Sequence, residues 1–313
     1  MTANNFIYFY ARHPDDEELC RLEMRSFFGE DTKTNVLLST VDIEPSRSIF
    51  MKGRLAVLFD AEDWSTLIQK AAAFQFSAET FKVLSLNTTL LNSTPKMDIE
   101  DRRKIEREIG LQINGEPDLD NPAVIFGFVQ IDKHWYFGLY TESKAVALKH
   151  RNKPHSYSTA LSTEHARTVA NIAVPFPQGV KVIDPCCGIG NVLVEALSMD
   201  FDIVGSDINW LVVKHTRENI AHFGYSCDVT ASSIADVDEQ YDVAIIDMPY
   251  NLFTSATPED QQNILLHARR IAKKVIVVTI DTMDDMIHNA NLTIIDRCEA
   301  KKSTFIRQIV VCV

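Results

Sequence analysis

An acid and two glycines lie close together in the stretch VIDPCCGIGN, residues 182–191. An apolar run ends at Asp184, and Gly188 and Gly190 follow it just before a segment with helical spacing of apolar residues. Glycines at such a turn let the backbone approach a small molecule at the carboxyl end of a strand. A pyrophosphate loop would read GxGxxG, whereas the acid here favours a cationic or amino-bearing ligand. S-adenosylmethionine, with its sulfonium and ammonium groups, fits this chemistry. A tight turn without a ligand is the alternative.

A second acid, Asp207, ends the apolar run in VGSDIN and lies 17 residues after Gly190. In doubly wound folds, a carboxylate at the end of the second strand commonly binds a ribose diol. Asp207 could instead cap the helix that follows it. The two interpretations are compatible, because a carboxylate has two oxygens.

A third acid ends an apolar run in IIDMPYN, residues 245–251. The exocyclic amine of a nucleobase is a poor nucleophile, because its lone pair is delocalised into the ring. The Asp247 carboxylate and the Met248 carbonyl, held rigid by Pro249, can each accept a hydrogen bond from such an amine. These bonds favour a pyramidal nitrogen whose lone pair points at a methyl group. Tyr250 then offers a face on which an extruded base can stack. The alternative is a turn cap followed by a core tyrosine.

The last third of the chain contains the elements that must position these acids. Apolar runs typical of strands occupy residues 180–184, 201–207, 227–231, 241–247, 274–280, 292–298 and 304–313, and helical patterns occupy residues 191–199, 210–223, 258–272 and 282–290. Strands that alternate with helices predict a parallel sheet covered by helices. The last two strands are too close in sequence for a parallel crossover, so they predict an antiparallel hairpin. We therefore predict an α/β fold with a seven-stranded, Rossmann-like methyltransferase sheet of five parallel strands plus a C-terminal antiparallel hairpin. A plain dinucleotide-binding domain would have six parallel strands. The strand order also predicts that Asp184 and Asp247 face one crevice.

The first half of the chain mixes short strands and helices, which predicts an N-terminal α+β domain. Residues 123–132 and 135–143 form a predicted hairpin. Prolines 154, 175 and 177 mark a boundary between the two halves.

The 313 residues leave room for two domains, and 46% apolar and 24% charged residues are ordinary for a soluble globular protein. No apolar window is long enough for a membrane span, and the N-terminus lacks the pattern of a signal peptide. Six scattered cysteines favour a reduced, cytoplasmic setting, and none of them has zinc-site spacing, so we expect no metal. The sequence leaves the oligomeric state open.

A net charge of −12 argues against broad electrostatic binding of nucleic acid. The sign reverses locally, because residues 141–180 contain five Lys and Arg but only two Asp and Glu. Within this segment, KHRNKPH carries Lys149, Arg151 and Lys153 just before the predicted catalytic domain. We expect these three side chains to contact RNA. A solvated linker is the alternative.

DPCCGIG together with IIDMPY resembles the class I S-adenosylmethionine-dependent amino-methyltransferases, whose fourth motif is Asp/Asn/Ser-Pro-Pro-Tyr. More narrowly, RNKPHSYSTALSTEHARTVANIAV (151–174), leading into IDPCCGIGNVLVEAL, is similar to the tRNA guanine-N2 methyltransferases that carry an N-terminal THUMP module. PSRSIFMKGRL (45–55) and EDRRKIEREIG (100–110) extend this likeness.

The resemblance implies methyl transfer from S-adenosylmethionine to N2 of a guanosine in tRNA, or in another structured RNA. It implies three regions: a THUMP-like, RNA-docking region at 1–150, a linker and lead-in helix at 151–178, and a methyltransferase domain at 179–313. Asp247, Met248, Pro249 and Tyr250 would hold the amine. The cofactor would contact Asp184, Pro185, Cys186, Gly188, Gly190, Asp207, Ile208 and Ser232.

The chain departs from the family pattern at three places. Met248 stands where the fourth motif has its first proline, which predicts a looser turn. Asn191 stands where a threonine is usual. Ser232 or Ser233 stands where an acid usually approaches the adenine amine, and a hydroxyl makes a weaker contact there. A methyltransferase of another RNA, of DNA or of a protein amide is therefore an alternative, as is a non-catalytic RNA-binding relative.

Overall fold

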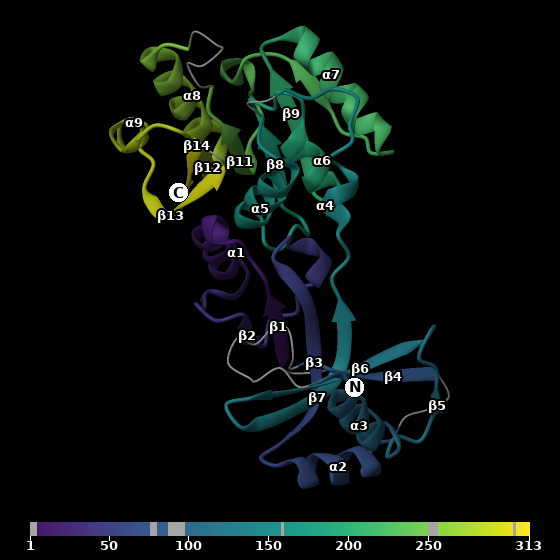
Figure 1. Cartoon of the computed structure of the whole chain (residues 1–313). Coiled ribbons are helices and arrows are strands. Elements are labelled where there is room, and N and C mark those ends of the chain that lie inside the picture. Colours follow the sequence, from purple (N-terminus) through teal and green to yellow (C-terminus); the bar gives the residue numbers. More distant parts are fainter. Residues whose placement is uncertain (1–4, 76–79, 87–97, 158–159, 250–255, 303–304) are drawn as a thin grey trace. The chain divides into compact units, whose positions relative to one another are not determined.

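The computed structural model describes residues 5–75, 80–86, 98–157, 160–249, 256–302 and 305–313 (Figure 1). The chain divides into two compact units. The first contains residues 1–11, 32–46 and 50–144, and the second contains residues 12–31, 47–49 and 145–313. Residues 12–31 and 47–49 lie within the range 1–150 that we expect to dock RNA, yet they pack with the second unit.

The first unit is a seven-stranded sheet in the order β2-β1-β3-β7-β6-β4-β5. Its strands are β1 (Phe6–Tyr10), β2 (Val36–Ser39), β3 (Met51–Ala61), β4 (Thr80–Ser85), β5 (Glu116–Pro117), β6 (Val124–Ile131) and β7 (His134–Glu142). The strands β6 and β7 form the predicted antiparallel hairpin. Helices α2 (Trp64–Ala73) and α3 (Ile99–Gly110) contribute to a core that contains the fully buried rings of Phe126, Phe128 and Phe137. This core is rich in aromatic contacts, which favour tilted and offset ring pairs.

The second unit contains the predicted methyltransferase sheet, in the order β10-β9-β8-β11-β12-β14-β13. Its strands are β8 (Lys181–Asp184), β9 (Asp202–Asp207), β10 (Val229–Ala231), β11 (Tyr241–Asp247), β12 (Ala272–Thr279), β13 (Ile294–Lys302) and β14 (Phe305–Cys312). The first five pair in parallel. The strand β14 pairs antiparallel with both β12 and β13. The predicted fold class is therefore confirmed, including the C-terminal hairpin.

Polar side chains cap some of the helices of this unit. The described helices are α1 (Glu17–Phe28), α4 (Val146–Lys149), α5 (Thr163–Ala173), α6 (Asn191–Leu197), α7 (Trp210–His222), α8 (Pro258–Ile271) and α9 (Asp284–Asn289). The Ser162 side chain caps α5 by accepting a bond from the backbone N–H of His165. Thr257 and Asp260 form a capping box at the start of α8. Every residue of α5 except Glu164 is buried, so this helix lies in the core of the unit. None of the described helices is both long and apolar enough to cross a membrane.

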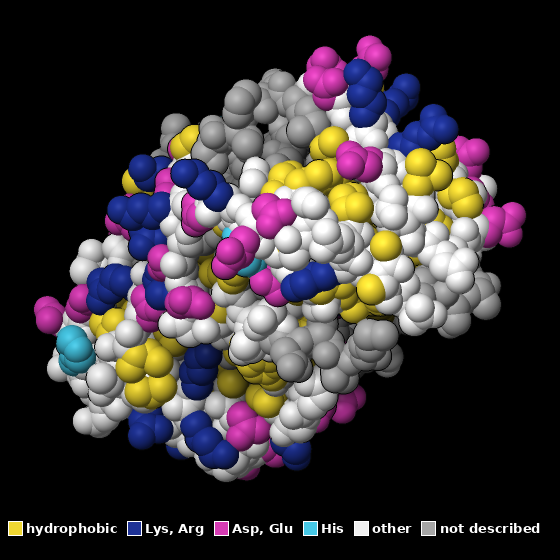
Figure 2. All heavy atoms as spheres, turned by 90° about the horizontal axis from the view of Figure 1, so that it is seen from below, with side chains coloured by type: hydrophobic (Ala, Val, Ile, Leu, Met, Phe, Trp, Pro, Cys, Tyr) yellow, Lys and Arg dark blue, Asp and Glu magenta, His cyan; other side chains and the backbone are white. Residues whose placement is uncertain are grey.

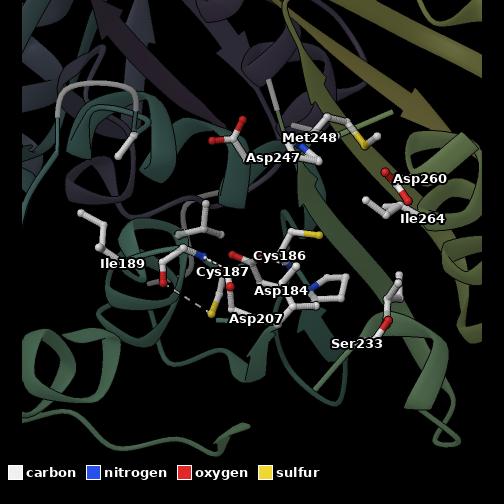
Figure 3. Close-up of a pocket in the computed structure, with 18 of the residues that line it drawn as sticks. Asp184, Cys186, Cys187, Ile189, Asp207, Ser233, Asp247, Met248, Asp260 and Ile264 are labelled. Atoms are coloured by element: carbon white, nitrogen blue, oxygen red, sulfur yellow. Dashed lines mark hydrogen bonds between the residues drawn. The ribbon is translucent and has the colours of Figure 1, made fainter. Parts of the chain in front are cut away.

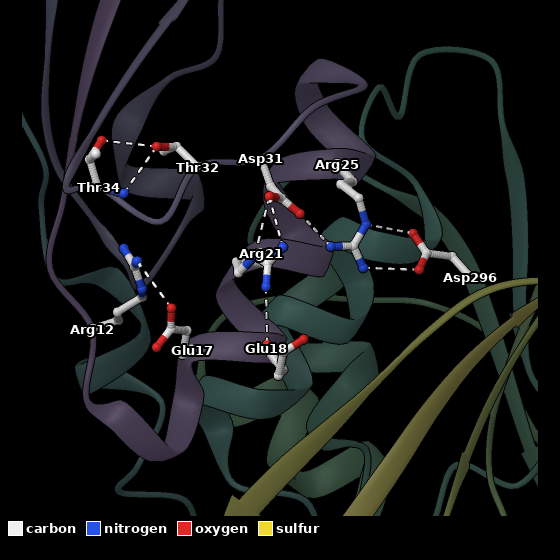
Figure 4. Close-up of polar contacts among 9 residues, drawn as sticks. All are labelled: Arg12, Glu17, Glu18, Arg21, Arg25, Asp31, Thr32, Thr34 and Asp296. Carbon is white, nitrogen blue, oxygen red and sulfur yellow. Dashed lines mark hydrogen bonds and ion pairs between the residues drawn. The ribbon is translucent and has the colours of Figure 1, made fainter.

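An ion pair between Arg25 and Asp296 links α1 to β13, and further pairs link α1 to Asp31 (Figure 4). The Arg25 guanidinium donates from Nε and Nη2 to the two carboxylate oxygens of Asp296, at 2.8 and 2.9 Å, and from Nη1 to Asp31 at 2.6 Å. Arg21 joins the same Asp31 carboxylate and also contacts Glu18. Bidentate pairs of this kind are stronger than single surface ion pairs. They add directional contacts to the apolar packing of α1.

A buried carboxyl group fastens α1 to α5. Glu23 accepts hydrogen bonds from the Ser48 hydroxyl and, at 2.7 Å, from Asn171 Nδ2. Arg47 donates to Asn171 Oδ1 at 2.9 Å and to the carbonyl of Pro175 just beyond α5. Glu23 is fully buried, and this burial raises the pKa of its carboxyl from 4.5 to about 7. Its protonation state therefore changes near neutral pH.

The raised pKa of Glu23 predicts a pH-dependent stability. Between pH 4.5 and about 7, the folded protein holds a proton that the unfolded chain has released. The free energy of unfolding therefore falls as the pH rises through this window, by up to about 3 kcal/mol. We expect the Glu23→Gln variant to lose this decline, whereas Glu30→Gln, which changes an exposed residue, retains it. Urea denaturation at pH 5 and pH 8 measures the difference. An equal decline in both variants would contradict the prediction.

A second buried network adjoins the first, because Arg167 and Asn171 on α5 both donate to the Arg47 carbonyl. The Glu195 carboxylate accepts from Arg167 Nη1 at 2.9 Å and lies 2.7 Å from His150 Nδ1. Arg167 also donates to Ser198 Oγ at 2.8 Å and to the carbonyl of Arg47 at 2.8 Å. Arg167, Glu195 and His150 are all buried, so each charge depends on these partners for its solvation.

Candidate active site

Three acids end three neighbouring parallel strands. Asp184 is the last residue of β8, Asp207 of β9 and Asp247 of β11. The carboxyl ends of parallel strands meet at one edge of a sheet, and all three residues line one cavity of about 900 Å³ (Figure 3). Asp184 and Asp247 therefore face the same cavity, as the strand order predicts.

The glycine turn packs closely against its neighbours. Gly188 has φ of 50° and Gly190 has φ of 80°, in the left-handed region that favours glycine. A Cβ atom at Gly188 would lie 2.7 Å from the Tyr157 hydroxyl, and one at Gly190 would lie 2.6 Å from Thr216 Cγ2. The turn thus requires glycine for its backbone conformation and for contact with these two side chains. Gly188 lines the cavity, whereas Gly190 lies at the start of α6 and is not among the lining residues.

Asp207 braces the glycine turn. Its Oδ2 accepts from the backbone N–H of Gly188 at 3.1 Å, and its Oδ1 accepts from that of Asn209 at 2.9 Å. The N-cap of α7 is Asn209, whose side chain accepts from the N–H of Leu211. Asn209, rather than Asp207, therefore caps this helix. Asp207 joins two strand ends and still lines the cavity.

Asp184 lies at the base of the cavity and is 3% exposed. Burial raises the pKa of its carboxyl well above the ordinary value, and the nearby charges of Asp247 and Asp207 act in the same direction. The backbone N–H of Cys186 donates to it at 3.3 Å, which opposes the rise. Among the described residues that line the cavity, none is Lys or Arg. A cationic ligand would relieve the repulsion among these carboxyl groups.

The segment after β11 is tied to the sheet. Met248 is 1% exposed, its side chain belongs to the apolar core, and its backbone N–H donates to the Val278 carbonyl at 2.9 Å. The Pro249 carbonyl accepts from Gln261 Nε2 at 3.2 Å. The turn is therefore anchored at Met248, in contrast to the looser turn that we expected there. Tyr250, the predicted stacking residue, lies outside the described residues.

Met248 gains a hydrogen bond that a proline could not make. We therefore expect Met248→Pro to lower the free energy of unfolding by about 2 kcal/mol or more, because the Val278 carbonyl loses its donor and the core loses a buried side chain. Met248→Leu keeps the N–H and a similar volume and should cost less than about 1.5 kcal/mol. Urea denaturation of the two variants measures the contrast. Equal losses would mean that the hydrogen bond contributes nothing.

The remaining predicted cofactor contacts divide into two groups. Pro185, Cys186 and Ile208 line the cavity. Ser232 does not: its hydroxyl lies 2.9 Å from that of Thr230, and Ser233 lines the cavity in its place.

Tyr157 is a lining residue that sequence reasoning did not single out. Although 48% of Tyr157 is exposed, desolvation, followed by the charges of Asp207 and Asp247, raises the pKa of its phenol to about 12, so it remains protonated and can donate a hydrogen bond. The sequence could have indicated Tyr157, because this residue lies in the 151–174 segment that carries the family resemblance.

The predicted RNA contacts lie outside the cavity lining. Lys149 is exposed at the end of α4, and Arg151 is exposed and paired with Glu164. Lys153 is half-buried. Figure 2 shows one face of the molecule, on which Lys and Arg side chains are interspersed with Asp and Glu rather than gathered in one patch. This mixture agrees with the acidic net charge. Among the described residues, no group of three or more His, Cys, Asp or Glu side chains is arranged to hold a metal ion.

Comparison with known proteins identifies the class of the second unit. Residues 177–309 match the family model of a methyltransferase domain. The chain therefore contains a methyltransferase domain, built on the seven-stranded sheet and bearing the cavity at its carboxyl edge.

Similarity to individual proteins extends beyond this domain. The tRNA (guanine(10)-N2)-dimethyltransferase of Methanothermobacter thermautotrophicus is 32% identical over 177 residues, which are 52% of this chain and 52% of the relative. The protein of the same name from Methanocaldococcus jannaschii is 25% identical over 178 residues, 51% of this chain and 50% of the relative. The chain thus spans about half the length of each relative. The crystal structure of TrmN from Thermus thermophilus aligns with 98% of this chain and 99% of its own, at 15% identity and a TM-score of 0.49.

Proposed function

We propose that the protein transfers a methyl group from S-adenosylmethionine to N2 of a guanosine in tRNA. The observation that carries the proposal is the shared cavity of Asp184, Asp207 and the Asp247-Met248-Pro249 segment. The methyltransferase-domain match and the names of the two relatives support the reaction and the substrate.

The cavity has the properties that the cofactor requires. Its volume of about 900 Å³ lies within the usual range for small-molecule sites, and the four carboxyl groups of its lining, Asp260 among them, suit a ligand with sulfonium and ammonium charges. Asp207, Ile208 and Ser233 would hold the nucleoside end, and Asp184 with the Gly188 turn would hold the charged end. The cofactor supplies an electrophilic methyl group when it is bound.

The protein's own contribution at the amine is orientation. The Asp247 carboxylate and the Met248 carbonyl would each accept a hydrogen bond from the guanine NH₂ and direct its lone pair toward the methyl group. The anchored Met248 and the bond from Gln261 to the Pro249 carbonyl would fix these acceptors in place. Tyr250 would stack on the extruded base.

Residues outside the cavity would bind the RNA. We place RNA docking on residues 1–150 and on Lys149, Arg151 and Lys153, in a cytoplasmic protein. Arg151 would exchange Glu164 for a phosphate, so its contribution would be smaller than that of an unpaired arginine.

A transfer assay across substrate classes tests the proposal. Purified protein is given S-adenosylmethionine with a radioactive methyl group and, in parallel, unmodified tRNA, rRNA, DNA and protein. We expect label in tRNA alone, and mass spectrometry of its nucleosides should identify N2-methylguanosine. Label in another class would replace the substrate while keeping the chemistry. Absence of label together with absence of cofactor binding in calorimetry would instead favour a non-catalytic relative.

A further inference from the structure

A fully buried asparagine on α7 uses its side chain to join two segments of the cavity wall. Asn219 Oδ1 accepts from the backbone N–H of His155 at 2.9 Å. Its Nδ2 donates to the carbonyls of His155 and Ile189, both at 3.0 Å. Because one partner is a donor and the other two are acceptors, the orientation of the amide is determined. Both of its N–H bonds are therefore used.

The two segments that Asn219 joins belong to the candidate site. Ile189 lies between the two glycines of the turn, and His155 lies two residues before Tyr157. The Tyr157 hydroxyl occupies the space where Gly188 would otherwise carry a side chain. The same helix face also holds the turn through Thr216, whose hydroxyl donates to the Gly188 carbonyl. The helix α7 thus fixes the glycine turn at two successive carbonyls.

We propose that Asn219 is a positioning residue that holds Tyr157 against the glycine turn and so gives the cofactor cavity its shape. It acts indirectly, through the segment that ends at Tyr157 and through the turn at Ile189, because its own side chain is fully buried and is not among the residues that line the cavity. A buried amide with three satisfied bonds is costly to break, so the arrangement persists without a ligand. This inference rests on the proposed function only where cofactor affinity is the readout.

The His155 ring provides a matched control. It pairs with Glu218 and stacks on His215 with ring centroids 3.9 Å apart. These contacts hold the same residue from the solvent side, since Glu218 is exposed. The Glu218→Gln variant removes the charge of this pair and leaves the three bonds of Asn219 intact.

A double-mutant cycle tests the inference. Calorimetry measures the affinity for S-adenosylhomocysteine in the wild type, Asn219→Ala, Tyr157→Ala and the double variant. We expect each single change to weaken binding about tenfold, the double variant to lose less than the two single losses combined, and Glu218→Gln to bind like the wild type. Additive losses, or an undiminished affinity of Asn219→Ala, would overturn the inference.

A second measurement needs no cofactor and also covers variants that are destabilised. Hydrogen exchange followed by mass spectrometry should show faster exchange in Asn219→Ala for peptides containing residues 155–157 and 186–190, with little change in the strands β11 and β12. Unchanged exchange at the first two segments, or a uniform increase throughout the second unit, would overturn the inference. If the wild type failed to bind S-adenosylhomocysteine while exchange responded as expected, the positioning role would stand and the proposed function would fail.

Discussion

Replacing Asp247 with alanine should lower kcat for the proposed methyl transfer to tRNA by about 100-fold or more. The carboxylate is one of two acceptors proposed to orient the guanine amine, and the loss of a positioned acceptor at a reacting group typically costs a factor of 10² to 10⁴. Cofactor affinity should change much less, because Asp184 and Asp207 remain. Single-turnover transfer measures the rate, and calorimetry with S-adenosylhomocysteine measures the affinity.

Asp247→Asn is the matched variant for this prediction. An asparagine keeps one oxygen acceptor at the same place, and the family motif that the sequence resembles accepts it. We expect Asp247→Asn to retain more activity than Asp247→Ala. If the alanine variant methylated tRNA at the wild-type rate, Asp247 would have no part in the chemistry.

Replacing Arg167 with methionine should lower the free energy of unfolding by about 3–5 kcal/mol. The change leaves the buried Glu195 carboxylate with His150 as a remaining partner, and an incompletely compensated buried charge is strongly destabilising. The Ser198 hydroxyl and the Arg47 carbonyl would lose a donor as well. Urea denaturation, followed by circular dichroism, measures the loss.

Two further variants separate this effect from the loss of any ion pair. Lys273→Ala breaks an exposed pair with Asp242 and should cost less than about 1 kcal/mol. Adding Glu195→Gln to Arg167→Met removes the stranded charge and should recover part of the stability. A double variant that is less stable than Arg167→Met would show that packing, rather than charge, dominates at this site.

The sequence was sufficient for the methyltransferase sheet, though not for the inclusion of residues 12–31 and 47–49 in its unit, because the signals of the sheet are local. Each strand of the methyltransferase sheet is a short apolar run, and the helices α5 and α8 begin at the capping side chains of Ser162 and Thr257. The strand order then brings Asp184 and Asp247 to one edge, since connectivity alone determines which carboxyl ends are neighbours. The C-terminal hairpin follows from the short link between its strands.

The features that the sequence did not reveal depend on contacts between distant residues. The strand β1 pairs with β2 and β3, so its place in the sheet is set by segments about 30 and 45 residues away. The position of Tyr157 depends on Gly188 and on the Asn219 amide. The choice between Ser232 and Ser233 depends on how the chain turns after β10, because adjacent residues face different directions.

The second unit is built from three separate stretches of the chain, so a single truncation does not isolate it. A fragment that starts at residue 145 would lack Glu23, Arg47 and Ser48, and the carboxamide of Asn171 would lose two of its side-chain partners. Such a fragment would present polar groups of α5, together with the apolar surface that α1 covers, to bulk water. Limited proteolysis should accordingly fail to release a stable C-terminal product, and subcloning for crystallisation should retain residues 12–49.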